Sequence, residues 1–295
     1  MWLVVINPTS GGGRGRKLGA EVVAKVRARN LEFVEIIENS AQATSDAIAS
    51  ALRNYPVTGV MVVGGDGLVH LVLQHVATTT IPLLVFPGGT GNDFVRALHA
   101  PLHDTDAILA NALSQPAVPV DIGRIGTEYF ADILSTGFDS RVNERANRIS
   151  LIKGPMKYNV AIALELPLFK AQRYFFEIDD EKFESDAMLI AVANGHSYGG
   201  GMQVCPDASM TDGLFDIMIL KPVSKIHFLR IFPKVFSGTH ISDPAVEIRR
   251  GKRVSINSAA VAYADGERIG GLPVEATVAP SALHTWPFNK NLASD

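Results

Sequence analysis

The chain has 295 residues, of which 47% are hydrophobic and 19% charged. This composition is typical of a globular protein and excludes a disordered one, and the length allows one large or two medium domains. The formal net charge of −3 gives no overall attraction to nucleic acid, so no nucleic-acid partner is expected.

The first residues and the cysteine content indicate the compartment. Cys205 is the only cysteine, so no intramolecular disulfide is possible and nothing requires an oxidising environment. The apolar start Met1–Ile6 lacks a basic flank and ends at Asn7-Pro8, which favours a buried strand over a signal peptide. No segment approaches the roughly 18 apolar residues that span a bilayer. The sequence therefore predicts a cytoplasmic protein.

The first third of the chain alternates short apolar runs with stretches of helical spacing. This order predicts a parallel sheet flanked by helices. The expected strands are Leu3–Ile6, Phe33–Ile37, Gly59–Val63 and Leu83–Phe86, and the expected helices are Lys17–Arg29, Thr44–Asn54, Leu68–Ala77 and Asp104–Leu113.

Beyond Val118 strand-like segments predominate, and turn residues such as Asp179-Asp180 separate them. The expected strands include Tyr174–Ile178, Ala187–Ala193, Leu214–Leu220, Val246–Ile248, Val254–Ile256 and Val274–Val278, and the expected helices are Pro155–Leu166 and Ser224–Phe236. We therefore expect an α/β nucleotide-binding domain over residues 1–118, joined by the C-terminal segment 281–295. A larger β-rich domain, an antiparallel β-sandwich with a few helices, is expected over residues 119–280.

Three glycine-rich turns follow three of the strands expected in the first domain. In an open parallel sheet the carboxyl ends of the strands lie on one edge, so these turns should converge there. Glycines let backbone N–H groups approach phosphate oxygens, and each following helix adds partial positive charge. One such turn would favour an ordinary tight reversal, but three on one edge predict a phosphate site. The turns are Asn7-Pro8-Thr9-Ser10-Gly11-Gly12-Gly13, Gly64-Gly65-Asp66-Gly67 and Pro87-Gly88-Gly89-Thr90-Gly91-Asn92-Asp93.

Two well-known nucleotide motifs do not occur here. The chain has no Gly-x-x-x-x-Gly-Lys-Ser/Thr, and no Gly-x-Gly-x-x-Gly follows the first strand. The turns instead resemble, in order and spacing, the catalytic domain of diacylglycerol kinases and their bacterial lipid-kinase relatives. The second half of the chain continues the match with Val120-Asp121-Ile122-Gly123, Asn194-Gly195, Gly199-Gly200-Gly201-Met202, Pro206-Asp207-Ala208, Thr211-Asp212-Gly213-Leu214-Phe215-Asp216 and Asp265-Gly266-Glu267.

This resemblance covers nearly the whole chain and implies a two-domain lipid kinase, related to sphingosine kinases and more distantly to NAD kinases. It implies that ATP binds between the domains and that Asp265 is the catalytic base, which takes the proton of the attacking hydroxyl. Asp66, Asp121 and Thr90 are implied to surround a catalytic magnesium ion (Mg2+). The alternative for Asp66 is a turn-forming residue. The implied nucleotide-binding residues are Asn7, Pro8, Thr9, Ser10, Gly64, Gly65, Gly67, Gly88, Gly89, Thr90, Gly91, Asn92 and Glu267.

The resemblance also implies a second, structural magnesium ion. Asp212 would bind it through its side chain, and Ser209 and Leu214 through their backbone carbonyl groups. Hard oxygen ligands of this kind suit magnesium. The alternative is that Thr211-Asp212-Gly213 only makes a tight turn before the next strand.

Several residues depart from the family pattern. Leu68 and Leu71 stand where threonine and glutamate are usual after the second glycine turn, and Gly12 stands where bacterial relatives carry a basic residue. These departures motivate a second interpretation, a catalytically weakened nucleotide- or lipid-binding homologue. NAD kinase is a third, because it shares the Gly-Gly-Asp-Gly turn. The positive charge directed at phosphate would then come from Arg14, Arg16 or Lys17. The alternative is that these basic residues only form the solvent-exposed beginning of a helix.

The lipid acceptor is expected near Asn194, the Gly199–Met202 turn and the apolar helix Val160–Leu168. Such an acceptor implies transient contact with the membrane surface, met from its inner face. The particular lipid and the oligomeric state stay open, with a homodimer among the alternatives.

Overall fold

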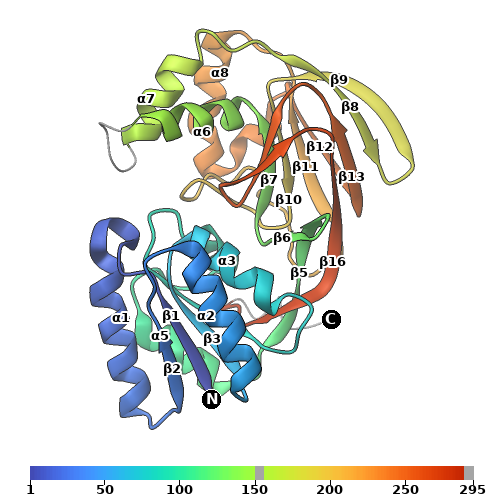
Figure 1. Ribbon diagram of the computed structural model, residues 1–295. Helices are drawn as coiled ribbons and strands as arrows, with labels where there is room; N and C mark the ends of the chain where they lie inside the picture. The colour runs from blue at the N-terminus through green and yellow to red at the C-terminus, as the bar shows by residue number, and fades with distance from the viewer. Residues whose placement is uncertain (150–155, 289–295) are drawn as a thin grey trace. The chain divides into compact units, whose positions relative to one another are not determined.

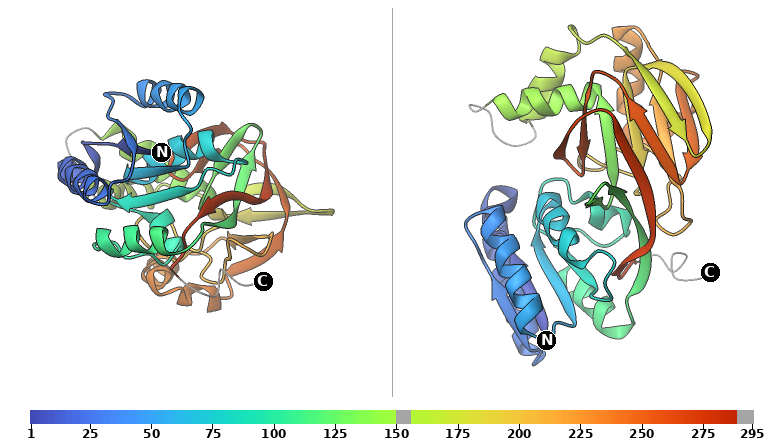
Figure 2. Two further views of the ribbon diagram at one scale, coloured as in Figure 1. Left: turned by 90° about the horizontal axis from the view of Figure 1, so that it is seen from below. Right: turned by 45° about the vertical axis from the view of Figure 1, so that its right-hand side comes forward.

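The computed structural model describes residues 1–149 and 156–288, and the chain forms two compact units (Figures 1 and 2). The first unit comprises Met1–Ile122 together with the chain from Pro280 onward, and the second comprises Gly123–Ala279. Strands β5 (Val118–Ile125) and β16 (Val274–Thr285) carry the chain from one unit to the other. Pro155, where a helix was expected to begin, and residues 289–295 of the expected C-terminal segment lie outside the described residues.

The first unit confirms the predicted parallel sheet. Its four strands have the order β2-β1-β3-β4, and every adjacent pair is parallel. All residues of β3 are buried, as expected for a strand that helices cover on both faces. The strands are β1 (Trp2–Ile6), β2 (Phe33–Ile36), β3 (Gly59–Gly64) and β4 (Leu83–Pro87), and the helices are α1 (Ser10–Ala28), α2 (Ala41–Asn54), α3 (Asp66–Val76), α4 (Asp93–Ala97) and α5 (Thr105–Ser114).

The segment after Pro280 is tied to this first unit at several points. Thr285 Oγ1 donates to the carbonyl of Leu83 (2.8 Å), and the indole N–H of Trp286 donates to the carbonyl of Gln115 (2.9 Å). Trp286 also belongs to the core that α1 and α5 share with the sheet. The last described residues therefore complete the core of a unit that begins with Met1.

The second unit confirms the predicted antiparallel sandwich. One six-stranded sheet has the order β12-β11-β10-β7-β14-β15, and the other has the order β6-β5-β16-β13-β8-β9. The remaining strands are β6 (Glu128–Phe130), β7 (Ile133–Gly137), β8 (Gln172–Ile178), β9 (Glu181–Ala187), β10 (Leu189–Ala193), β11 (Phe215–Leu220), β12 (Val246–Gly251), β13 (Arg253–Asn257), β14 (Val261–Ala264) and β15 (Glu267–Gly271).

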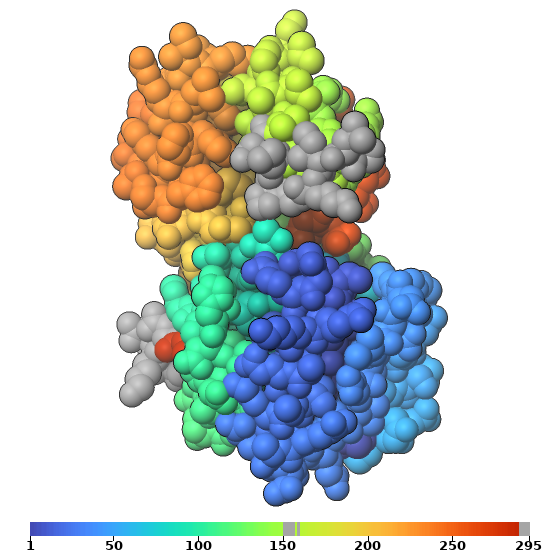
Figure 3. Space-filling view, turned by 90° about the vertical axis from the view of Figure 1, so that its left-hand side faces the viewer, coloured from blue at the N-terminus to red at the C-terminus, as the bar shows by residue number. Residues whose placement is uncertain are grey.

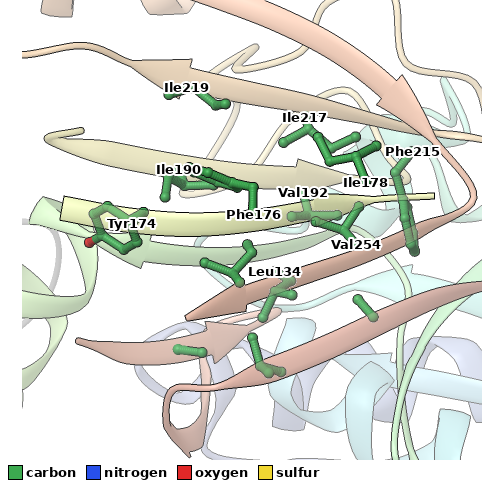
Figure 4. Packing of buried hydrophobic residues seen from close by; sticks show 14 of the residues in the cluster. Leu134, Tyr174, Phe176, Ile178, Ile190, Val192, Phe215, Ile217, Ile219 and Val254 are labelled. Atoms are coloured by element: carbon green, nitrogen blue, oxygen red, sulfur yellow. The ribbon is translucent and has the colours of Figure 1, made fainter. Parts of the chain in front are cut away.

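The core of the second unit lies between its two sheets (Figure 4). Leu134, Val192 and Ile217 enter it from one sheet, and Phe176 and Val254 enter it from the other. Because side chains alternate along a strand, each sheet buries one face in this core, and the side chains of its opposite face are free to contact other elements.

The opposite face of the first of these sheets is covered by helices. These are α6 (Phe138–Arg148), α7 (Met156–Glu165) and α8 (Lys225–Ile231), and the 3₁₀ helices η1 (Phe232–Ser237) and η2 (Thr239–Ser242) follow α8. A second apolar core joins Ile133 and Ala191 of the sheet to Phe138 of α6 and Phe228 of α8. No helix among the described residues is long and apolar enough to cross a membrane.

Two predicted elements of the second unit were wrong in detail. The next strand expected after Tyr174–Ile178 was Ala187–Ala193, across the Asp179-Asp180 turn, but the turn pairs β8 with β9. The expected segment contributes β10, which pairs with β7 and β11. Strand β9 lies at the edge of its sheet and carries mostly charged residues, so the apolar pattern did not reveal it. The predicted helix Ser224–Phe236 is α-helical only to Ile231, because Pro233 has no N–H to continue the pattern.

Candidate active site

The three glycine turns converge at the carboxyl edge of the parallel sheet. The N–H of Gly88 donates to the carbonyl of Gly64 (2.7 Å), and the Cα of Gly65 would lie only 2.4 Å from a Cβ built on Gly89. A Cβ on Gly11 would likewise lie 2.4 Å from the carbonyl oxygen of Gly88. The backbones of the turns therefore pack directly against one another, which only glycine allows at these points.

The first turn is shaped by local hydrogen bonds and by left-handed glycines. Asn7 Oδ1 accepts from the backbone N–H of Thr9 (3.0 Å) and from its hydroxyl (2.8 Å), across Pro8. Ser10 Oγ donates to the carbonyl of Asn7 (3.0 Å). The next three residues, Gly11, Gly12 and Gly13, all have positive φ (56°, 72° and 99°). This run displaces the start of regular helix in α1 and forms a glycine loop at the sheet edge.

Arg14, one of the three candidate cations of the sequence analysis, contacts these turns. Its Nε donates to the carbonyl of Gly11 (3.1 Å), and its terminal nitrogen donates to the carbonyl of Gly89 (2.9 Å). Arg14 therefore links the first turn to the third, beside the Gly12 position where the family pattern has a basic residue. A guanidinium held there is suited to neutralise phosphate charge.

Asp66 connects the second turn to the third. Its two carboxylate oxygens accept hydrogen bonds from the backbone N–H groups of Asn92 (2.8 Å) and Asp93 (2.7 Å). These donors belong to the N-cap residue and to the first residue of α4, where a negative charge is favourable. Asp66 thus has a definite structural role, and Gly67 follows it in the first turn of α3.

The third turn is held further by its own side chains. Asn92, at a φ of 54°, accepts from the N–H of Gly89 through Oδ1 (2.9 Å) and donates to the carbonyl of Gly89 through Nδ2 (3.2 Å). Arg96 Nε donates to the carbonyl of Gly91 (3.1 Å). Thr90 lies between Gly89 and Gly91 and is exposed. The hydrogen bonds to Gly89 and Gly91 fix the backbone on both sides of it.

Asp121 lies on β5 in the same unit and is buried. Its Oδ1 accepts from the backbone N–H of Ser281 on β16 (2.8 Å), where Ser281 has a φ of 53°. This bond joins the two strands that leave the first unit. Asp66 and Asp121, two of the three predicted catalytic carboxylates, therefore both occur in the first unit, and each accepts backbone hydrogen bonds.

Asp265, the predicted base, lies in the second unit on a tight hairpin. Asp265 (φ 48°) and Gly266 (φ 85°) form the loop between the paired residues Ala264 and Glu267, and positive φ at both loop positions is typical of a type I′ turn. The carboxylate accepts three backbone hydrogen bonds, from Ala131 (2.7 Å), Asp132 (2.9 Å) and Ile133 (3.2 Å). Its orientation is therefore fixed. Glu267 begins β15 and is exposed.

Asn194 contacts the same segment as Asp265. It is fully buried, its Nδ2 donates to the carbonyl of Ala131 (2.7 Å), and its backbone N–H donates to the carbonyl of Asp132 (2.8 Å). Three positive-φ glycines follow at Gly199, Gly200 and Gly201. The structure thus brings together Asp265 and Asn194, two residues of the second half that the sequence analysis placed in catalysis and acceptor binding.

The predicted structural magnesium site does not fit as the residues lie. One oxygen of Asp212 accepts from the backbone N–H of Leu214 (3.1 Å), and the other pairs with the guanidinium of Arg250. Arg250 also pairs with Asp216 (3.3 Å). A guanidinium bound to the only carboxylate of the Ser209–Asp212–Leu214 set takes the place that a cation would need. No cluster of three or more metal-binding side chains occurs among residues 1–149 and 156–288.

One unusual carboxyl group escaped the sequence analysis. Asp139 lies in the first turn of α6, and both of its carboxylate oxygens are buried. This burial raises its pKa to about 6 despite the nearby hydroxyls of Ser135 and Tyr198. Perturbed carboxyl groups concentrate at functional sites, although structural ones exist. The segment Phe138-Asp139-Ser140 has no spacing that reveals burial, so only the fold identifies this group.

Comparisons with known proteins cover both units. The diacylglycerol kinase catalytic domain matches residues 1–125, and the YegS C-terminal NAD kinase beta sandwich-like domain matches residues 132–286. A curated diacylglycerol kinase of Mycobacterium tuberculosis (strain CDC 1551 / Oshkosh) is 36% identical over 284 residues, which span 94% of this chain and 92% of that protein. The diacylglycerol kinase of Bacillus subtilis (strain 168) is 31% identical over 278 residues, or 92% of this chain and 91% of that protein.

A solved structure shares the fold. The crystal structure of a diacylglycerol kinase from Bacillus anthracis str. Sterne superposes with a TM-score of 0.78 at 19% identity, and the match covers 98% of each chain. At this identity the likeness concerns the fold alone.

Proposed function

The chain belongs to the diacylglycerol kinase family, and on that premise we propose that it transfers the γ-phosphoryl group of ATP to the hydroxyl group of a lipid, with diacylglycerol as the acceptor. The observation that carries the proposal is the convergence of three glycine turns at one sheet edge, tied together by Asp66 and Arg14. Phosphoryl transfer depends on positioning and charge stabilisation, which such a frame supplies.

In this proposal the first unit holds the nucleotide. Backbone N–H groups of the turns donate to the phosphate oxygens, and Arg14 adds positive charge beside them. Asp66 and Asp121 are the residues that would hold magnesium near the phosphates. Their oxygens already accept backbone hydrogen bonds, so contact through water suits them better than direct coordination. Magnesium, when bound, offsets the charge of the phosphates and of the carboxylates.

The second unit supplies the base. Asp265 takes the proton of the lipid hydroxyl while the oxygen of that hydroxyl bonds to the γ-phosphorus. The bond between the γ-phosphorus and the oxygen that bridges it to the β-phosphate breaks, which gives a phosphorylated lipid and ADP. The three backbone N–H groups that hold Asp265 keep its carboxylate in one orientation, so little reorganisation is needed at the moment of transfer.

The acceptor resides in a membrane, so the protein must meet the membrane surface to reach it. We place this contact at the inner face of the membrane, where ATP is available.

Labelled ATP and a panel of acceptors test the proposal. The panel contains diacylglycerol, monoacylglycerol, a sphingoid base, phosphatidylglycerol, a polyprenol and NAD, each offered with magnesium. We expect label in the phosphorylated diacylglycerol. Label in NADP with none in any lipid would assign an NAD kinase instead. Binding of ATP without transfer to any acceptor would support the weakened homologue that Leu68, Leu71 and Gly12 suggest.

A further inference from the structure

The second unit exposes large apolar side chains on neighbouring helical elements. Of the ten large hydrophobic side chains that are most exposed among the described residues, five lie on or next to α7, α8 and η1. They are Leu164 (50% exposed), Leu168 (70%), Ile226 (66%), Leu229 (58%) and Phe236 (54%), and together they are called the α7–α8 face here.

The elements that carry these side chains pack against one another. Lys225 at the start of α8 donates to the carbonyl of Phe169, which follows α7, and its Nζ lies 5.9 Å from the ring of Phe169. The ring of Phe138 contacts Phe169 (5.3 Å between centroids) and also Phe228 of α8 (5.0 Å). Figures 1 and 3 show α7 and the segment of α8 and η1 beside each other on one side of the unit.

Helix α8 is apolar on both of its sides. Phe228 and Ile231 are buried against the core, whereas Ile226 and Leu229 point away from it. A surface helix normally buries one apolar stripe and presents polar residues elsewhere. The second apolar side of α8 is therefore not needed for folding and indicates a partner.

The charge around this face is positive, although the chain as a whole has a net charge of −3. The segment Leu220–Ser242 contains no Asp or Glu, and its cations are Lys221, Lys225, Arg230 and Lys234. Of these, Lys221 pairs with Glu247, and Asp243, the next residue after the segment, bonds to His227, so the positive charge of the face rests on Lys225, Arg230 and Lys234. Lys170 adds a further exposed cation beside Leu168. Glu165, the acidic residue of α7, is buried and paired with Arg141 and Arg145, so it does not offset these charges at the surface.

We propose that the α7–α8 face docks on the surface of an anionic lipid bilayer. Exposed Leu, Ile and Phe side chains on helices can enter the boundary between headgroups and acyl chains, while Lys and Arg bind the headgroup phosphates. The inference rests on the proposed lipid acceptor, because an enzyme for a water-soluble alcohol has no use for such a face.

Charge argues against the main competing occupant. In a symmetric dimer through this face, the basic patch of one copy would face the basic patch of the second copy. An anionic bilayer matches the apolar and the basic side chains together, whereas a second copy matches only the apolar ones.

Flotation with lipid vesicles tests the proposal on the full chain without ATP. We expect wild-type protein to float with phosphatidylcholine vesicles that contain phosphatidylglycerol, and to float less as salt is added. The double variant Ile226→Ser/Leu229→Ser should bind at least tenfold more weakly, and Phe236→Ser should show a smaller loss. The matched control is Phe175→Ser, because Phe175 is also 54% exposed but lies on β8 in the other sheet.

Unchanged flotation of the double variant, or an equal loss in Phe175→Ser, would overturn the proposal. Sedimentation without lipid provides the second arm. A concentration-dependent dimer that the double variant abolishes would assign the face to a second copy instead.

Turnover separates this inference from the proposed function. With a short-chain diacylglycerol in solution, the double variant should phosphorylate at the wild-type rate, and it should slow only with long-chain diacylglycerol in anionic vesicles. Wild-type binding to vesicles without phosphorylation of any lipid would leave the docking face intact and remove the proposed function. Phosphorylation of a lipid with no vesicle binding by the wild type would leave the proposed function intact and remove the docking face.

Discussion

Asp66 shows how a single residue can have a structural role that its motif does not reveal. The sequence analysis expected it near magnesium, with a turn-forming role as the alternative. In the structure its two oxygens accept the N–H groups of Asn92 and Asp93 and so connect two glycine turns. Both roles are compatible, because a carboxylate oxygen has a second lone pair.

Asp66→Asn tests this connecting role. An asparagine would turn an N–H₂ group toward a backbone N–H, so one donor would lose its acceptor. We expect a loss of about 1 to 3 kcal/mol in the free energy of unfolding and weaker ATP binding in the absence of magnesium. Urea unfolding and calorimetric titration with ATP measure both. If the variant unfolds like the wild type and ATP binding changes only when magnesium is present, Asp66 acts through the metal alone.

Asp139 gives a pH dependence that can be predicted in sign. Burial raises the pKa of this carboxyl group from 3.8 to about 6, so between these values the folded protein binds more protons at this site than the unfolded chain does. The contribution of Asp139 to stability therefore falls as the pH rises through this window, by about 3 kcal/mol in total.

Asp139→Asn should remove that fall. We expect the difference in unfolding free energy between variant and wild type to shift in favour of the variant from pH 4 toward about pH 6. Urea unfolding of both proteins across this range measures it, with Asp180→Asn, at an exposed turn, as the control. A difference that stays constant with pH would contradict the buried, titrating carboxyl.

At the scale of residues, the sequence pattern located the glycine turns and Asp265 but not the hydrogen bonds that hold them. The Asp265-Gly266 pair is a turn signal in any sequence. The three backbone donors from Ala131, Asp132 and Ile133 that hold its carboxylate come from a segment more than 130 residues away. No local pattern carries such a contact, and the same holds for the bond between Asp212 and Arg250.

Among the helices, α6 and α7 are joined by ion pairs between one buried glutamate and two partly exposed arginines. Glu165 is almost fully buried and accepts from Arg141 (3.1 Å) and Arg145 (2.5 Å). Burial alone would raise the pKa of Glu165, but the hydrogen bonds from Arg145 and Arg141 outweigh it and the pKa is lowered. These bonds thus hold α7, which carries part of the α7–α8 face, against α6.

Glu165→Gln should lower the free energy of unfolding by about 1 to 3 kcal/mol at pH 7, because the charge-assisted bonds weaken within a buried site. Since the folded pKa is depressed, this contribution is present above the unfolded value of 4.5 and is lost as the pH falls through the folded value. Glu184→Gln is the matched control, because its pair with Arg173 is half exposed and is expected to contribute less than about 1 kcal/mol. Equal effects of the two substitutions in urea unfolding would contradict a special role for Glu165.

Elements were predictable where their pattern is strong. Three of the four strands of the parallel sheet are continuous apolar runs, and their existence and parallel type were predicted from the sequence, whereas their order in the sheet was not. Strand β9 and helix α6 were missed, because the first is a charged edge strand and the second is mostly polar, with buried residues only at Phe138, Ser140, Val142 and Ala146. In both cases tertiary pairing, rather than local pattern, decides the structure.

For the whole molecule, the two units divide the proposed reaction between them. The first carries the glycine turns, Asp66 and Asp121, and the second carries Asp265, Asn194 and the α7–α8 face. The family resemblance predicted that both halves carry motifs of one family, but the predicted boundary at residue 118 placed Asp121 with the second domain, whereas the structure places it in the first unit. The acceptor does not follow from the sequence, since an apolar site discriminates each methylene group by only about 1 to 3 kcal/mol and leaves no short motif.

The most direct test of the account is transfer of labelled phosphate from ATP to diacylglycerol in mixed micelles, compared between the wild type and Asp265→Asn. We expect label in the lipid for the wild type and a loss of at least a hundredfold in turnover for the variant, with ATP binding and cooperative unfolding retained. No labelled lipid from the wild type, or equal turnover in the two proteins, would contradict it.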